Sequence, residues 1–264
     1  MITEDIERHL VCSQLERFCS KHAKLQRPLA LVTSGGTCAD LELNSVRCLD
    51  NFSTGLRGAL SVEAFLSKGY AVIHLQRRGS VSPFACRLCQ KLGYLTGSLN
   101  VEAFARLMSK NRSDDAHIDE KISNDSIVVS SLRGLRKALD DDLLLTVTFR
   151  SVEDYLQRLE DCCKSMSSPY EERGSMKLCV VYLAAAVSDF YIPKEERCLH
   201  KIQSRSTVGS TGSPGVSLEL KPVPKLLRKV VDDWCRESFV ISFKLEVGLM
   251  LFRRSPHNEL FLVL

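Results

Sequence analysis

Leu29-Ala30-Leu31-Val32 runs directly into Thr33-Ser34-Gly35-Gly36-Thr37, and after a polar loop the chain continues Asp50-Asn51-Phe52-Ser53-Thr54-Gly55-Leu56-Arg57-Gly58-Ala59. The first of these segments is typical of a buried strand, and residues 58–68 are typical of a helix. Glycines between a buried strand and the start of a helix allow backbone amides to approach an anion closely. The sequence therefore predicts a phosphate- or nucleotide-binding turn whose glycines are divided into two pairs, Gly35 with Gly36 and Gly55 with Gly58.

The divided glycines differ from the compact turn of common dinucleotide-binding proteins, because a G-x-G-x-x-G run is absent. A tight strand-to-helix turn without a ligand is the simpler alternative. The next expected strand is followed by Gln76-Arg77-Arg78 rather than by the acidic residue that binds an NAD ribose. Arg77 and Arg78 would suit the additional phosphate of NADP, so an NADP-binding reductase of Rossmann type is a second interpretation.

The composition is that of an ordinary globular protein, since 44% of the 264 residues are hydrophobic and 26% are charged. No apolar run reaches the length of a membrane span, and the acidic first residues are unlike a secretory signal. The net charge of +4 is compatible with small anionic ligands, but its dispersal along the chain argues against nucleic acid. We therefore expect neither a membrane nor a nucleic acid as a partner.

The eleven cysteines form an odd and scattered set. Without an export signal they are expected to be free thiols in a reducing compartment, which indicates a cytoplasmic location. Cys86 and Cys89 have the spacing of metal ligands, but a zinc site requires a second such pair, and the adjacent Cys162 and Cys163 lack that spacing. We therefore expect no metal site built by the protein.

Alternating strand and helix patterns predict a Rossmann-like, doubly wound α/β fold with a mainly parallel sheet and flanking helices in a single domain. The strands are expected at 29–33, 71–75, 127–130, 143–147, 178–183 and 239–242, although 132–145 fits a helix equally well. The helices are expected at 3–26, 57–68, 152–163, closed by the turn Ser167-Ser168-Pro169, and 224–234. Ile6, Leu10, Leu15 and Phe18 should share one face of the first helix. We divide the chain into an N-terminal helix (1–28), a Rossmann-like domain (29–246) and a divergent tail (247–264).

Several polar residues follow expected strands, at the sheet edge where doubly wound folds bind their ligands. Asn51 is placed to donate a hydrogen bond to a developing oxyanion, although an asparagine in a turn is the commoner case. Ala184-Ala185-Ala186 would allow a ligand to lie against the backbone, and Asp189 adds a carboxylate beside it. Lys201 precedes a loop rich in Ser and Gly and would neutralise a triphosphate if that loop closed. Helix packing on the alanines, Asp189 as a helix cap and a solvated lysine are the structural alternatives.

Together these segments resemble phosphopantothenoylcysteine synthetase, also called phosphopantothenate–cysteine ligase, in its eukaryotic one-domain form. They follow the order and spacing of that family over residues 29–246. The matching segments are Val32-Thr33-Ser34-Gly35-Gly36-Thr37, Val46-Arg47, Leu49-Asp50-Asn51-Phe52-Ser53, Tyr182-Leu183-Ala184-Ala185-Ala186-Val187-Ser188-Asp189-Phe190-Tyr191, His200-Lys201-Ile202-Gln203-Ser204, Val223-Pro224-Lys225-Leu226-Leu227 and Ile241-Ser242-Phe243-Lys244-Leu245-Glu246.

The resemblance implies a homodimer that acts in coenzyme A biosynthesis and joins 4'-phosphopantothenate to L-cysteine. ATP would convert the carboxylate to an acyl-adenylate, and the amine of cysteine would displace AMP. By the same resemblance, Asn51 steadies the acyl-adenylate and Lys201 neutralises the triphosphate. The implied nucleotide-binding residues are Gly35, Ser53, Gly55, Gly58 and Phe243, to which the glycine pattern adds Gly36, and the implied substrate-binding residues are Asn51, Ala185, Ala186 and Asp189. Mg²⁺ is expected with ATP and carried by its phosphates, because no acidic cluster marks a protein-built site.

The chain departs from the family's pattern after Glu246, because residues 247–264 do not align with it. The later lysines and the asparagine through which the family also contacts the nucleotide have no counterpart there. We therefore expect a poor or inactive ligase, with a non-catalytic protomer that binds a nucleotide as a further alternative.

Overall fold

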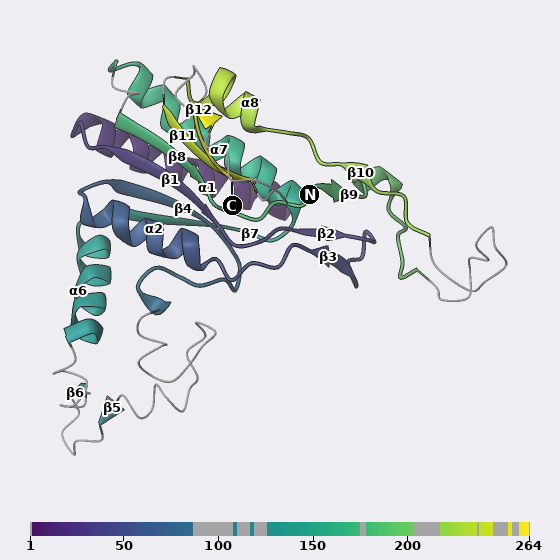
Figure 1. The fold of residues 1–264 in the computed structure, drawn as a ribbon, viewed down its shortest axis with the longest axis horizontal. Coiled ribbons are helices and arrows are strands. Elements are labelled where there is room, and N and C mark those ends of the chain that lie inside the picture. The colour runs from purple at the N-terminus through teal and green to yellow at the C-terminus, as the bar shows by residue number, and fades with distance from the viewer. Residues whose placement is uncertain are drawn as a thin grey trace.

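A computed structural model of the chain describes residues 2–86, 108–109, 117–118, 126–174, 178–202, 217–236, 238–244, 253–254 and 259–263. Its centre is a seven-stranded sheet with the order β12-β13-β11-β8-β1-β4-β7, shown in Figure 1. Each pair of neighbouring strands is parallel except β12 with β13. The strands are β1 (Leu29–Ser34), β4 (Ala71–Arg77), β7 (Leu144–Phe149), β8 (Cys179–Leu183), β11 (Phe239–Lys244), β12 (Arg253–Arg254) and β13 (Glu259–Val263).

Helices cover both faces of this sheet (Figure 1). Helices α1 (Ile2–Lys24) and α7 (Val152–Glu171) lie on one face, and α2 (Leu56–Ser67) and α6 (Ser126–Asp140) lie on the other. Alternation along β1 explains this arrangement, because Leu29 and Leu31 belong to the core cluster under α1 and α7, whereas Ala30 and Val32 belong to the cluster under α2. The doubly wound, mainly parallel α/β fold expected from the sequence is therefore confirmed.

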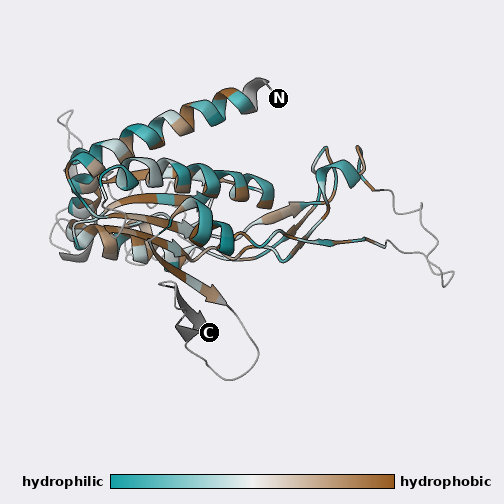
Figure 2. Ribbon diagram, turned by 90° about the horizontal axis from the view of Figure 1, so that it is seen from above, coloured by the Kyte–Doolittle hydropathy of each residue, from teal (hydrophilic) through white to brown (hydrophobic). Residues whose placement is uncertain are grey.

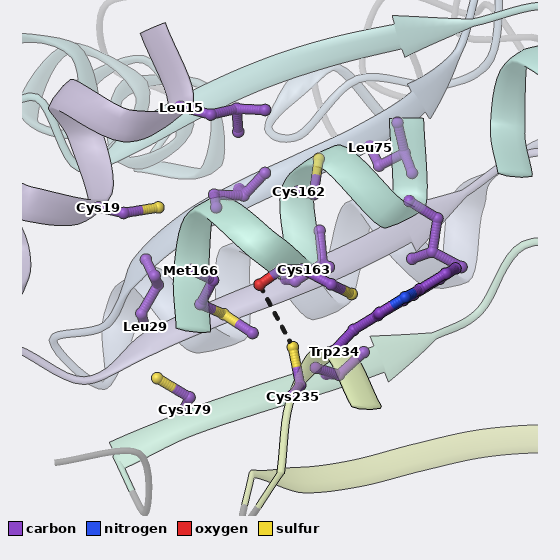
Figure 3. Close-up of a cluster of buried hydrophobic side chains, with 14 of the residues drawn as sticks. Leu15, Cys19, Leu29, Leu75, Cys162, Cys163, Met166, Cys179, Trp234 and Cys235 are labelled. Atoms are coloured by element: carbon purple, nitrogen blue, oxygen red, sulfur yellow. Dashed lines mark hydrogen bonds between the residues drawn. The ribbon is translucent and has the colours of Figure 1, made fainter. Parts of the chain in front are cut away.

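The larger core lies between the sheet, α1, α7 and a short helical segment made of α8 (Leu227–Lys229) and the π-helix η3 (Val230–Trp234). Figure 3 shows five of its buried cysteines, which are Cys19, Cys162, Cys163, Cys179 and Cys235. The ten cysteines in the described part of the chain are free thiols, as expected. No described helix combines the length and the apolar character needed to cross a membrane.

The strand expected at 127–130 is wrong, because these residues belong to helix α6. The β-branched run Ile127-Val128-Val129 favours a strand locally. In the structure, however, Ser131 and Ala138 are buried on the inner face of a helix, and a Cβ at Gly134 would lie 2.6 Å from the ring of Phe84. Packing of this helical face against the rest of the molecule therefore overrides the local preference.

Helix α7 continues to Glu171 instead of ending at Ser167-Ser168-Pro169. Tyr170 is fully buried and its hydroxyl donates to the carbonyl oxygen of Arg27 at 2.6 Å. The hydroxyl of Ser167 donates to the carbonyl oxygen of Trp234. These tertiary contacts hold the last turn in helical form although a proline usually interrupts a helix.

Helix α1 is buried along only part of its expected apolar face. Leu15 and Phe18 lie in the core, whereas Ile6 is 56% exposed and Leu10 is 59% exposed. Figure 2 shows the N-terminal part of this helix extending beyond the other elements. The expected apolar face therefore packs on the rest of the chain only in the second half of the helix.

An arm built from two small antiparallel sheets extends from the carboxyl ends of the central strands (Figure 1). Its first hairpin pairs β2 (Cys38–Asp40) with β3 (Cys48–Asp50), and its second pair joins β9 (Phe190–Tyr191) to β10 (Lys221–Pro222). A 3₁₀ turn, η2 (Lys194–Glu196), follows β9. A further short pair, β5 (Met108–Ser109) with β6 (His117–Ile118), lies apart from the arm.

Candidate active site

The glycine turn after β1 is hydrogen-bonded to the alanine segment after β8. The amide of Ala186 donates to the carbonyl oxygen of Gly35 at 2.8 Å, and the amide of Thr37 donates to the carbonyl oxygen of Ala186 at 3.0 Å. Gly35 has a φ of +89°, which favours glycine over residues with a side chain. Two segments that are distant in the sequence therefore form one surface at the carboxyl edge of the sheet.

Asn51 is held against the same turn. Its amide donates to the carbonyl oxygen of Thr37 at 3.0 Å, and its side chain is half-buried. A Cβ at Gly36 would lie 1.6 Å from the carbonyl oxygen of Asn51, so only glycine permits this approach. Backbone contacts therefore bring the predicted asparagine to the predicted glycine turn.

The second glycine pair packs on Ser34, the last residue of β1. The hydroxyl of Ser34 donates to the carbonyl oxygen of Gly55 at 2.9 Å, and a Cβ at Gly58 would lie 2.5 Å from the Ser34 side chain. Gly55 has a φ of +77°, again in the region that favours glycine. All four glycines predicted from the sequence therefore surround the end of one strand and the start of one helix.

Helix α2 begins at Gly55 as its N-cap and has no side-chain cap hydrogen bond. The expectation that Ser53 or Thr54 caps this helix is therefore wrong. Their hydroxyls instead accept local hydrogen bonds from the amides of Gly55 at 3.3 Å and Leu56 at 3.4 Å. Thr54 thus engages the first amide of the helix, and the positive end of the helix dipole at this point favours an anion.

A pocket of about 620 Å³ lies beside the alanine segment, at the ends of β8 and β11. The predicted residues Ala185, Asp189 and Phe243 all line it. Most of its wall is apolar, including Leu159, Leu183, Val187, Val223, Leu226 and Val230. Such a concave apolar site with a few polar groups is typical of a small-molecule pocket.

Phe243 connects this pocket to the start of α2. The guanidinium carbon of Arg57 lies 4.6 Å from the centroid of the Phe243 ring, and the ring of Tyr182 meets it edge-on at 5.1 Å. Arg57 lies between Gly55 and Gly58 in the sequence, so this contact links Phe243 to the first turn of α2. Phe243 therefore both lines the pocket and contacts a side chain of α2.

Asp189 and Lys201 are both exposed, but they are held differently. The backbone carbonyl of Asp189 accepts a hydrogen bond from Val223 at 2.8 Å, which fixes its position at the pocket rim. Lys201 lies on the arm, in a segment joined to the β2–β3 turn through the Leu43 amide, which donates to the Cys198 carbonyl oxygen at 2.9 Å. Among the described residues, no contact joins Lys201 to the glycine turn, and the loop 203–217 lies almost wholly outside them.

Two threonines and a tyrosine of the site were missed in the sequence. Thr33 accepts a hydrogen bond from the Ala185 amide at 3.1 Å, and Thr37 accepts one from the Ser188 amide at 2.9 Å. Tyr155 of α7 lines the pocket and hydrogen-bonds to Thr33, and burial raises the pKa of its hydroxyl well above its ordinary value. The available signal was a threonine at each side of the glycine pair, Thr33 near the end of the buried strand and Thr37 directly after Gly36.

The arginines that suggested NADP binding are engaged within the protein. Arg77 forms an ion pair with Asp50 at 2.5 Å, and Arg78 forms one with Glu7 of α1 at 3.3 Å. A second phosphate-binding function would have to compete with these carboxylates. The structure therefore gives the reductase interpretation less support than the sequence did.

One group of side chains in the described part of the chain has donor atoms close enough for a metal ion. Cys38, Asp40 and Cys48 place these atoms within 4.8 Å of one another on the β2–β3 hairpin. Asp40, however, is ion-paired with Arg150 at 3.0 Å, and that positive charge opposes a bound cation. The other candidate pair, Cys86 and Cys89, lies partly outside the described residues, since these include Cys86 but not Cys89.

Comparison with known proteins assigns the family. No protein-family model matches the chain. Over 232 residues, however, it is 38% identical to the human phosphopantothenate–cysteine ligase, and the match covers 88% of this chain and 68% of the human protein. The chain belongs to the phosphopantothenate–cysteine ligase family. Similarity to the mouse phosphopantothenate–cysteine ligase agrees, with 35% identity and coverage of 93% of this chain and 72% of the mouse protein.

The rice phosphopantothenate–cysteine ligase 2 (Oryza sativa subsp. japonica) is 40% identical over 215 residues, which make up 81% of this chain. The chain spans 58% of the length of that rice ligase. The resemblance to this ligase family that the sequence motifs indicated is therefore confirmed over most of the chain.

The fold also matches a solved structure of the ligase family. A Cab2 mutant in complex with phosphopantothenate-cysteine superposes with a TM-score of 0.72 and 32% sequence identity, covering 91% of this chain and 71% of Cab2. This structural similarity indicates that the two proteins share the arrangement of the central sheet and of the loops that follow its strands.

Proposed function

We propose that the function of this chain is the ligase reaction of its family, which joins 4'-phosphopantothenate to L-cysteine with ATP in coenzyme A biosynthesis. The expectation of a poor or inactive ligase, which follows from the divergence of residues 247–264, stays a prediction. The carboxylate oxygen of 4'-phosphopantothenate attacks the α-phosphorus of ATP, and pyrophosphate leaves. The cysteine amine then attacks the acyl carbon, loses a proton and expels AMP. The observation that carries this proposal is the pair of hydrogen bonds that joins the glycine turn to the alanine segment beside Asn51.

The nucleotide would bind where the glycine pairs meet the start of α2. The missing side chains of these glycines allow Ser34, Arg77 and the backbone of Asn51 to pack directly against the turn and the helix start, where Ser53 adds a hydroxyl. Amides at a helix N-terminus stabilise phosphate charge that must otherwise repel an attacking carboxylate. Phe243 would hold the base, because aromatic faces stack on bases.

The acyl substrate would lie along Ala185 and Ala186, with Asp189 at the pocket rim. Asn51 is hydrogen-bonded to Thr37, which is in turn hydrogen-bonded to Ala186, so the side-chain amide of Asn51 would donate to the developing oxyanion when cysteine attacks. Lys201 would neutralise the triphosphate as a point charge. Placing these groups around one reacting carbon lowers the entropic part of the barrier.

Mg²⁺ would accompany ATP on the oxygens of its phosphates. Of the acidic residues near the site, Asp50 is paired with Arg77, and Asp189 is a single exposed carboxylate. This donor set suits a metal that keeps several waters and phosphate ligands. When bound, the ion neutralises charge that develops on the leaving pyrophosphate.

We further propose that the chain forms a homodimer. The arm exposes apolar side chains, including Val46, which is 60% exposed, and the following loop exposes 86% of Phe52. Apolar side chains gathered on one protruding element are typical of an association surface. Light scattering after size exclusion should give twice the mass of the 29.6 kDa chain.

The reaction is tested by measuring pyrophosphate and AMP release from ATP with and without each acceptor. We expect release that requires 4'-phosphopantothenate and full turnover that also requires L-cysteine. Asn51→Ala should slow the cysteine-dependent step, whereas Asn44→Ala, which changes an exposed asparagine of the arm, should not. Absence of product with every combination, together with stabilisation by ATP, would instead support a nucleotide-binding protomer without catalysis.

The reductase alternative is tested by thermal unfolding with ATP or with NADPH. ATP should raise the midpoint temperature, because a ligand that binds only the folded state stabilises it. NADPH should leave it unchanged, since Arg77 and Arg78 are already paired with carboxylates. A larger shift with NADPH than with ATP would contradict the ligase proposal.

A further inference from the structure

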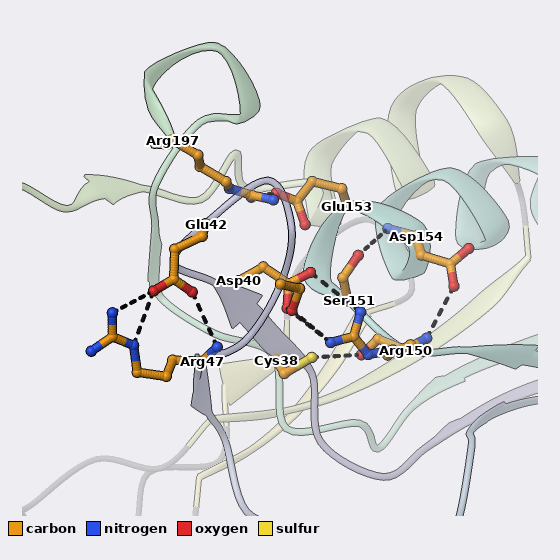
Figure 4. Close-up of polar contacts among 10 residues, drawn as sticks. Cys38, Asp40, Glu42, Arg47, Arg150, Ser151, Glu153, Asp154 and Arg197 are labelled. Atoms are coloured by element: carbon orange, nitrogen blue, oxygen red, sulfur yellow. Dashed lines mark hydrogen bonds and ion pairs between the residues drawn. The ribbon is translucent and has the colours of Figure 1, made fainter. Parts of the chain in front are cut away.

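Glu42 is a carboxylate buried in the turn between β2 and β3, and its side chain is 0% exposed. A buried carboxylate is costly unless it is paired and hydrogen-bonded. Arg47 supplies the pairing, donating to Oε1 from Nε at 2.9 Å and from Nη2 at 2.6 Å, and to Oε2 from its amide at 3.1 Å (Figure 4). A pair this well satisfied, in a surface arm far from the main core, requires an explanation beyond the stability of the turn.

The same two side chains also hold the backbone of Ile202. The Ile202 amide donates to Glu42 Oε1 at 3.4 Å, and Arg47 Nη2 donates to the Ile202 carbonyl oxygen at 2.9 Å. Both polar backbone groups of one residue are thus bound by one ion pair, although Ile202 is separated from it by more than 150 positions in the sequence. Two hydrogen bonds to one residue define the position and the orientation of its backbone.

Lys201 is the residue directly before Ile202, and its own side chain is exposed. On the other side, the Cys198 carbonyl accepts the Leu43 amide at 2.9 Å and the Leu199 carbonyl accepts the Asn44 amide at 3.2 Å. The backbone is therefore fixed on both sides of Lys201, while its ammonium group stays available. A fixed backbone with a free side chain allows a lysine to hold its charge within a defined region.

We propose that Glu42 and Arg47 form a clamp that positions Lys201. Both are positioning residues, since they act through the backbone of Ile202. What Lys201 does once positioned rests on the proposed function, in which its ammonium group meets the triphosphate. Burial by itself would raise the pKa of Glu42, but the hydrogen bonds from Arg47 and Ile202 outweigh it and keep the pKa below its ordinary value, so the clamp is charged at neutral pH.

How firmly the backbone is held at Lys201 is measured by trypsin cleavage of the full-length chain under native conditions. The rate of cleavage at the Lys201–Ile202 bond is followed by mass spectrometry. We expect Glu42→Gln and Glu42→Ala to speed cleavage at this bond by about tenfold, because local opening exposes it. Asp40→Asn is the matched control, since it breaks the Asp40–Arg150 pair in the same hairpin without touching Ile202. Equal cleavage rates in the wild type, both Glu42 variants and the control would overturn the clamp.

A second readout separates this inference from the proposed function. Acylation of Lys201 by an N-hydroxysuccinimide ester is measured with and without ATP in the wild type and in Glu42→Gln, whose folding is checked by circular dichroism. We expect ATP to protect Lys201 in the wild type and to protect it less in the variant. If cleavage responds to Glu42→Gln but ATP protects Lys201 in neither protein, the clamp stands and the role given to Lys201 is wrong.

Discussion

The carbonyl oxygen of Asn51 occupies the space in which a side chain at Gly36 would begin. A Cβ on residue 36 would lie 1.6 Å from that oxygen, and the Asn51 amide is at the same time hydrogen-bonded to Thr37 at 3.0 Å. The glycine turn and the asparagine loop thus touch through their backbones. The absence of a side chain at residue 36 is what allows Asn51 to reach the edge of the sheet.

Gly36→Ala should therefore separate the asparagine loop from the turn. We expect it to lower the free energy of unfolding by more than about 3 kcal/mol, because the overlap is with backbone atoms that cannot rotate away. Gly69→Ala is the control, since a Cβ at residue 69 meets nothing within 4 Å and its cost of about 1 kcal/mol comes from the left-handed backbone alone. Urea titrations measure both, and equal costs would contradict this account of the turn.

Phe243→Leu should weaken ATP binding. The substitution keeps an apolar side chain on β11 but removes the ring that lies 4.6 Å from the Arg57 guanidinium carbon. We expect a roughly tenfold increase in the dissociation constant of ATP, the loss of about one stacking interaction. Phe239→Leu, at the other end of the same strand, should leave the affinity unchanged in calorimetric titrations. An unchanged affinity for Phe243→Leu would remove this residue from the nucleotide site.

His74 should make the fold sensitive to acid. It is fully buried in β4, neither of its ring nitrogens has a hydrogen-bond partner, and burial lowers its pKa from 6.5 to about 4. The unfolded chain therefore binds a proton before the folded chain does. Stability is complete above pH 6.5 and falls between pH 6.5 and 4, by about 1.4 kcal/mol for each pH unit.

Replacement of this histidine tests the sign of the effect. Between pH 7 and pH 5, the wild type should lose about 2 kcal/mol more stability than His74→Leu, as measured by urea unfolding at each pH. His9→Gln, at an exposed position of α1, should behave as the wild type does. Parallel pH profiles of the wild type and His74→Leu would show that His74 is not the titrating group.

The ion pair between Arg8 and Asp161 should contribute measurably to the attachment of α1. Arg8 donates to both carboxylate oxygens, at 2.7 Å and 3.1 Å, and the Asp161 side chain is only 6% exposed. Arg8→Met should cost about 1–3 kcal/mol, because it leaves a buried carboxylate without its partner. Arg17→Met, on an exposed position of the same helix, should cost less than about 0.5 kcal/mol by denaturant titration. Equal effects would show that the pair carries no net stability.

The cysteines should differ sharply in their reaction with iodoacetamide. Cys48 and Cys198 are exposed, whereas Cys162 and Cys163 are fully buried with raised pKa values, caused chiefly by burial for Cys162 and by the hydrogen bond with Cys235 for Cys163. Because the thiolate is the reactive form, the buried pair should be modified only after unfolding. Mass spectrometry of the native protein reports this order, and early modification of Cys162 or Cys163 would contradict the packing of the core.

Local sequence pattern was sufficient to predict those elements whose own residues favour the structure that they adopt in the fold. The apolar runs at 29–33, 71–75 and 178–183 are strands of the central sheet, and the glycines after the first of them form the turn that the sequence predicted. A buried strand is apolar on both faces wherever it lies, so its signal needs no knowledge of its neighbours. The motifs around Asn51 and Ala185 likewise identified the family, because they are local runs of residues.

Local sequence pattern gave the wrong prediction where contacts with other elements determine the secondary structure or the burial of a residue. The β-branched start of α6 reads as a strand, the last turn of α7 contains a proline, and Ile6 and Leu10 face solvent although they fit an apolar stripe. In the same way, no pattern near Glu42 indicates that its carboxylate holds the backbone of Ile202. The sequence by itself determined the most apolar strands, the glycine turn and the family, because these depend on what each residue is. Only the tertiary structure decided which helices persist and which distant residues meet, because those outcomes depend on contacts whose free energy exceeds the weak preference of any single segment.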